Sequence, residues 1–123
     1  MMVISFKEDN AVKQIISKKV IATMRNYAKN VYTNIKIYAK IDDKEVVGEG
    51  VIVLTAMNIQ VIRKALLKYS GFKDEEEWIN TAKKIYKKDK PPKYILLIKI
   101  KDLRISEAKQ EIEEINEQSY EIL

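Results

Sequence analysis

The chain has 123 residues, of which 46% are hydrophobic and 33% are charged, and its formal net charge at pH 7 is +5. This length suits one globular domain that buries a single core. The sequence contains no Cys and no His, which excludes disulfides, thiol catalysis, zinc fingers and histidine-based acid–base chemistry. We expect no metal and no cofactor.

The charge is unevenly distributed along the chain. Residues 106–123 contain six Glu and one Lys, a net charge of −5, which leaves +10 on residues 1–105. A body with this excess attracts polyanions, and nucleic acid is the most abundant candidate. The alternative is that the lysines only keep the domain soluble.

Two features concern the cellular setting. The longest apolar run of the later half, residues 94–98, is far too short to span a bilayer, and the N-terminus lacks a signal-peptide hydrophobic region. We therefore expect a cytoplasmic protein with no membrane partner. The many Lys, Glu, Ile and Tyr residues, with only three Gly, give a composition like that of thermophile and archaeal proteins.

The first half of the chain is expected to form four strands and one helix. The expected elements are, in order, a strand over residues 3–6, a helix from about 11 to 18 capped by Asp9 or Asn10, a strand over 20–24, a loop over 26–34, a strand over 35–41 and a returning strand over 46–54. Asp42 and Asp43 supply the turn of a hairpin between the last two strands. Gly48 and Gly50 interrupt the returning strand and indicate a bulge or the close approach of another backbone.

The second half is expected to contain helices followed by one more strand. Asn58 can cap a helix that Gly71 ends. Asp74 opens a further helix, and the spacing of its apolar residues places Trp78 in the core. An apolar strand is expected over residues 94–100.

The acidic segment 106–123 is expected to be a unit of its own beside the domain of residues 1–105. Ser106 can cap a helix here, and Ile112 and Ile115 lie on an apolar edge that needs a surface to cover. We expect this helix to pack on the domain or on a second copy, which would make a homodimer. A free acidic tail is the alternative.

The first candidate site lies in the stretch that ends at Arg25. Alternate residues of a strand share a face, so Thr23 and Arg25 point the same way, and Lys19 joins them if the alternation extends back to it. A hydroxyl, a guanidinium and an ammonium on one face suit a phosphate, a carbonyl or a carboxylate. The alternative is that Arg25 pairs with a carboxylate and that Thr23 only fills the strand.

A second candidate surface is the outer face of the strand over residues 35–41. Its apolar residues alternate with Lys36, Tyr38 and Lys40, which gives a basic face with an aromatic side chain between two lysines. The lysines would engage phosphates, and Tyr38 could stack a base.

The order of these elements suggests a small mixed barrel and resembles the ASCH domain family of the PUA-like superfamily over roughly residues 3–100. The pieces that carry the resemblance are Phe6-Lys7, the Lys-Lys and Ala-Thr-Met-Arg of Lys18 to Arg25, the glycine-containing strand from Gly48 to Ile52, the Gly71-Phe72 step, and Ile85-Tyr86 before the last strand. The resemblance implies an α+β fold, with a β-barrel of about five or six strands flanked by helices. It also implies a cleft that faces RNA or a modified nucleoside.

Two positions depart from the family pattern. The family's lysine precedes the arginine by five residues, a position that is Val20 here, with Lys19 beside it. Some members are small amidohydrolases of N4-acetylcytidine, and their acidic residue before the Gly-Phe-like step is Ser70 here. A threonine without a nearby carboxylate would be a poor nucleophile.

We therefore expect a module of ASCH type that binds RNA or a nucleotide. The expected contacts are Lys19, Thr23, Arg25, Lys36, Tyr38 and Lys40. The alternative is a small amidohydrolase acting on a modified nucleoside such as N4-acetylcytidine, with Lys19 and Thr23 as its catalytic residues.

Overall fold

The computed structural model describes residues 2–107, which form one α+β unit. Its strands are β1 (Met2–Phe6), β2 (Val20–Arg25), β3 (Asn34–Ile41), β4 (Lys44–Met57) and β5 (Tyr94–Glu107). Its helices are α1 (Asp9–Lys18), α2 (Gln60–Leu66), the short 3₁₀ helix η1 (Leu67–Tyr69) and α3 (Glu75–Tyr86). The expected α+β class and the expected order of the elements in this range are confirmed.

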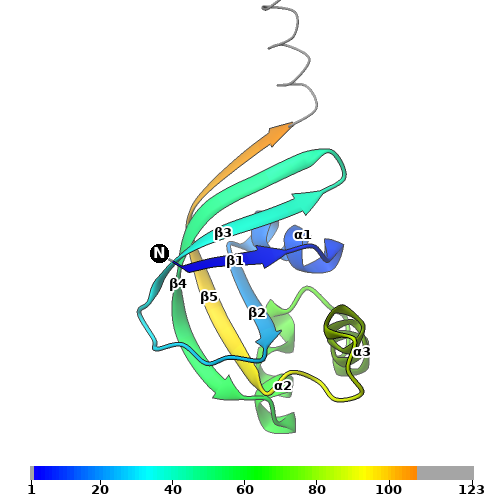
Figure 1. Ribbon diagram of the computed structural model, residues 1–123. Helices are drawn as coiled ribbons and strands as arrows, with labels where there is room; N and C mark the ends of the chain where they lie inside the picture. The colour runs from blue at the N-terminus through cyan, green and yellow to red at the C-terminus, as the bar shows by residue number, and fades with distance from the viewer. Residues whose placement is uncertain (1, 108–123) are drawn as a thin grey trace, which may run out of the picture.

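The five strands form one curled sheet in the order β1-β3-β4-β5-β2. β1 runs parallel to β3, whereas the other neighbouring pairs are antiparallel. Figure 1 shows that the sheet is strongly curved. The sheet is a half-barrel, because β1 and β2 remain its two edges within residues 2–107. Of the expected β-barrel of about five or six strands, the structure shows five strands in an open half-barrel.

The opening between β1 and β2 is bridged by a side chain. The guanidinium of Arg25 at the end of β2 donates through Nη2 to the carbonyl oxygen of Ser5 in β1, at 3.0 Å. Phe6 ends β1, and α1 begins at Asp9. The chain thus leaves the sheet after five residues, before a ladder between the two edges could form.

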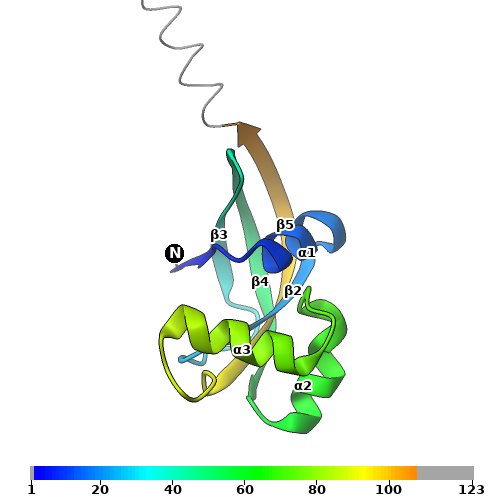
Figure 2. The same cartoon turned by 90° about the vertical axis from the view of Figure 1, so that its right-hand side faces the viewer.

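The core divides into two clusters that use opposite faces of β2, since Ile21 belongs to the larger cluster and its neighbour Ala22 to the smaller one. The larger cluster joins α1 to the inner faces of β1, β3, β4 and β5, and the smaller one lies between β2, β5, α2 and α3. β3 alternates strictly between exposed and buried residues, as its sequence predicts. Trp78 of α3 is 3% exposed and belongs to the smaller cluster, which confirms its expected place in the core. Figure 2 shows α3 crossing in front of this end of the sheet.

Gly48 in β4 permits a close approach of two backbones. A Cβ at this position would lie 2.3 Å from the carbonyl oxygen of Asp102 in β5, so no larger residue fits without a shift. The ladder between β4 and β5 changes register between Glu49 and Gly50, and the extra residue is Lys101 of β5, so the irregularity lies opposite these glycines and not in their own strand.

The last strand is longer than expected and includes the residue predicted to cap a C-terminal helix. β5 continues to Glu107, and Ser106 pairs with Glu45 of β4. Ser106 is therefore a strand residue, because β4 begins early enough, at Lys44, to give it a partner. The rest of the expected C-terminal helix lies outside the described residues.

Among residues 2–107, none of the helices has the length and hydrophobicity that crossing a membrane requires.

Candidate functional site

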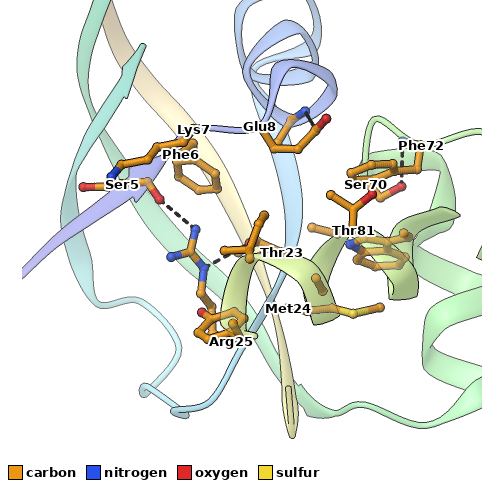
Figure 3. A pocket seen from close by; sticks show the side chains of 16 residues that line it. Ser5, Phe6, Lys7, Glu8, Thr23, Met24, Arg25, Ser70, Phe72 and Thr81 are labelled. Atoms are coloured by element: carbon orange, nitrogen blue, oxygen red, sulfur yellow. Dashed lines mark hydrogen bonds between the residues drawn. The ribbon is translucent and has the colours of Figure 1, made fainter. Parts of the chain in front are cut away.

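A cavity of about 310 Å³ opens between the two edges of the half-barrel and α3. Figure 3 shows its side chains converging from the end of β1, from β2, from the turn before α3 and from α3 itself. This volume lies at the lower end of the range for small-molecule sites. The lining side chains are those of Ser5, Phe6, Lys7, Glu8, Ala11, Ala22, Thr23, Met24, Arg25, Ser70, Phe72, Trp78, Thr81, Ala82, Ile85 and Tyr86.

Arg25 is the most firmly held cation of the cavity. Its Nε donates to Thr23 Oγ1 at 3.1 Å, its Nη2 donates to the carbonyl oxygen of Ser5 at 3.0 Å, and its guanidinium lies 4.8 Å from the ring centre of Phe6. A guanidinium has five N–H donors. These bonds use two of them, and the guanidinium also interacts with the phenol of Tyr27, so the side chain is held in place on the cavity wall.

Thr23 lies beside Arg25 on the cavity wall and is 9% exposed. The alternation of β2 brings the two side chains together, as the sequence predicts. Because Thr23 Oγ1 accepts a hydrogen bond from Arg25, its own hydroxyl proton is available to a ligand acceptor. The pair therefore presents several donors to one small volume.

Lys19 does not join this pair. It is the C-cap of α1 with a left-handed backbone (φ 59°), and its Nζ donates to the carbonyl oxygen of Ile16 at 2.8 Å. This backbone conformation breaks the strand alternation before Val20, so Lys19 lies beside residues 100–103 of β5 instead of lining the cavity.

The second predicted surface, on β3, also lies apart from the cavity. Lys36, Tyr38 and Lys40 are exposed, as their alternation predicts. Each lysine faces a glutamate across the ladder, because Lys36 pairs with Glu49 and Lys40 with Glu45. These carboxylates offset much of the positive charge that the sequence of β3 alone indicates.

Tyr38 belongs to the same exposed face and is tied to β4. Its hydroxyl donates to Glu45 Oε1 at 3.3 Å. Desolvation, and then the charge of Glu45, raise the pKa of the Tyr38 phenol above its ordinary value.

A second tyrosine with a raised pKa, Tyr27, interacts with Arg25 of the cavity wall. Burial raises the pKa of the Tyr27 phenol, and the positive charge of Arg25 opposes that rise. Both phenols therefore stay protonated at neutral pH.

The aromatic walls of the cavity were not expected as part of the site. They come from Phe6, Phe72, Trp78 and Tyr86, which belong to three separate segments of the chain. One pattern in the sequence pointed to these walls, the apolar stripe of α3, since Trp78, Ala82 and Ile85 of that stripe all line the cavity.

Glu8 is the one carboxylate that residues 2–107 place on the cavity wall, and the sequence analysis did not identify it as a site residue. The expected cap of α1 was Asp9 or Asn10, whereas Glu8 is the cap and its Oε2 accepts from the backbone N–H of Ala11 at 3.0 Å. Ser70 also reaches the cavity, at the position where the resembled family has an acid. It is fully buried and satisfied, donating to Leu67 and accepting from the N–H of Phe72.

No protein-family model matches this sequence, and no curated protein matches it either. Within residues 2–107, the acidic side chains form no cluster of three that could hold a metal ion. The described residues thus form an α+β half-barrel with a small cavity, lined in part by aromatic side chains, at its open edge.

Proposed function

We propose that this protein binds single-stranded RNA or a nucleotide, with one base inserted into the cavity. The observation that supports this proposal most directly is the Arg25–Thr23 pair, held at fixed geometry on the wall of an aromatic-lined cavity. Aromatic side chains stack on the faces of bases, and a few fixed polar groups bind their edges. A cavity of about 310 Å³ suits a single base better than a folded polymer.

The phosphates of the ligand would lie outside the cavity. Lys7 lines its wall, and Ile85 and Tyr86 at the end of α3 line it too. A lysine-rich segment surrounds these two residues in the sequence, with lysines at positions 83, 84, 87, 88 and 90. Together with the net charge of +10 on residues 1–105, this segment supports electrostatic attraction of a polyanion.

The resemblance to the ASCH domain family supports the same proposal. The family is expected to place a Thr-x-Arg pair in a cleft that faces RNA or a modified nucleoside, and Thr23 and Arg25 lie together on the cavity wall here. The proposal therefore keeps Thr23 and Arg25 as contacts of the base and assigns no base contact to Lys19.

The first prediction is retention on immobilised single-stranded RNA at low salt, with loss of retention as salt rises, because bound phosphates displace counterions. We expect Arg25→Ala and Thr23→Val to weaken binding, with Arg25→Ala costing about 1–3 kcal/mol. The matched control is the double change Lys36→Ala with Lys40→Ala, which removes two charges from the face that does not line the cavity. Binding lost in the control and kept in Arg25→Ala would place the RNA on β3 instead.

A second candidate function is hydrolysis of an amide on a modified nucleoside such as N4-acetylcytidine. It is favoured by one observation, that the carboxylate of Glu8 lines the same cavity as the Thr23 hydroxyl. In this reaction Thr23 Oγ would attack the acetyl carbonyl while Glu8 takes the hydroxyl proton and returns it to the leaving amine. Water would then hydrolyse the threonyl ester to acetate.

The second prediction tests this candidate. Purified protein incubated with N4-acetylcytidine would release cytidine and acetate, and both Thr23→Val and Glu8→Gln would abolish the release, since general-base catalysis alone is worth about a hundredfold to ten-thousandfold. Lys19→Ala is the control and should leave the rate unchanged, because Lys19 lies away from the cavity. Absence of release from the unmodified chain would reject hydrolysis while leaving the binding proposal intact.

A further inference from the structure

The outer end of β5 has one unpaired edge. β5 spans Tyr94–Glu107, yet β2 pairs with it only as far as Lys99. The last backbone bond on that side joins the N–H of Ile100 to the carbonyl oxygen of Lys19, at 2.9 Å. Beyond this point only β4, on the other side, pairs with β5 among the described residues. Figures 1 and 2 show this end of β5 projecting past α1 with β4 along one side. On the other side Lys19, at the end of α1, lies beside residues 100–103, and no described strand pairs with β5 there.

An edge of this kind exposes backbone donors and acceptors that can pair with another strand. The exposed segment, residues 101–107, contains no proline, so its backbone keeps every donor. Ile105 within it is 47% exposed, so the segment also offers an apolar side chain to a second strand. This edge of β5 therefore offers free backbone donors and acceptors with which another strand can pair.

We propose that this edge pairs antiparallel with the same edge of a second copy, with Leu103 opposite the partner's Leu103 on the two-fold axis. In that register Asp102 faces the partner's Arg104, and Arg104 faces the partner's Asp102. Asp102 and Arg104 are both exposed, and they flank Leu103 in the sequence. Opposite charges that face each other across an antiparallel ladder stabilise it, and a two-fold axis doubles each such contact.

Neighbouring registers lack this complementarity. Centring the axis on Arg104 would place two arginines opposite each other, and centring it on Ile105 would place Arg104 opposite the partner's Ser106. Within one chain Asp102 lies opposite Glu49 of β4, a like charge, and no ion pair joins it to another described residue. The partner's arginine would give Asp102 the counter-charge that its own sheet does not supply. A second copy therefore fits this edge better than an unrelated peptide.

The test uses the full chain in sedimentation velocity over a dilution series at low salt. We expect a reversible dimer in the unchanged protein and a monomer at the same concentrations in Asp102→Arg and in Arg104→Asp, since each change sets like charges against each other. An equimolar mixture of the two variants should recover the dimer, because every facing pair is then opposite in sign. The double change Asp102→Arg with Arg104→Asp should dimerise by itself. Circular dichroism checks that each variant is folded.

Three results would overturn the proposal. One is an unchanged protein that stays monomeric at every concentration. Another is a dimer that persists in both single variants, which would place the interface elsewhere, as in the acidic segment after residue 107. The third is a mixture of folded single variants that remains monomeric. The mixing experiment keeps the test decisive if one variant alone dimerises weakly.

Discussion

At Ser70 the chain buries a hydroxyl completely, directly before the turn that leads to α3. The hydroxyl both donates and accepts, because Oγ donates to the carbonyl oxygen of Leu67 at 2.7 Å and accepts from the N–H of Phe72 at 3.0 Å. Phe72 forms part of the cavity wall. Ser70 therefore fixes one wall of the site through the backbone.

Ser70→Ala is predicted to destabilise the fold by about 1–3 kcal/mol, because it leaves the part-buried N–H of Phe72 and the carbonyl of Leu67 without this partner. Urea unfolding followed by circular dichroism measures the change. The matched control is Ser17→Ala, since Ser17 also donates to a backbone carbonyl, at 2.7 Å, but on the exposed end of α1. Equal unfolding midpoints for the two variants would contradict the role assigned to Ser70.

Single residues also show how far the sequence predicts the site. Thr23 and Arg25 share a face because a strand alternates, and that rule needs only the local sequence. Lys19 would share this face only if the strand extended back to it. Its left-handed backbone instead makes the strand begin at Val20. Glu8 could not be chosen over Asp9 and Asn10 as the helix cap, because three adjacent polar side chains can all accept the same backbone donor.

At the scale of elements, local patterns predict the interior of a strand or helix better than its ends. The alternation of β3 and the apolar stripe of α3 follow from residues within each element. The end of β5 depends on a different segment, since its last residues form a strand only where β4 supplies a ladder. Asn58 was expected to cap α2, but its side chain donates instead to the carbonyl oxygen of Pro92 at 2.7 Å, a contact across 34 residues.

At the scale of the whole molecule, the cavity depends on the order of strands in the sheet. Its walls come from residues 5–8, 22–25 and 70–86, which only the completed fold brings together. Parallel pairing of β1 with β3 leaves β1 and β2 as the two edges of the sheet. The opening between these edges makes room for the site, and no local pattern in the sequence contains that information.

The proposal that a base enters this cavity is tested most directly by the fluorescence of Trp78. The chain contains a single tryptophan, and it lines the cavity. Titration with the four nucleoside 5′-monophosphates, and with short single-stranded RNA, should change its emission in a saturable way. The Arg25→Ala variant should need a higher ligand concentration for the same change. RNA that is retained by the protein while the emission of Trp78 stays constant would contradict the proposal, because the base would then lie outside the cavity.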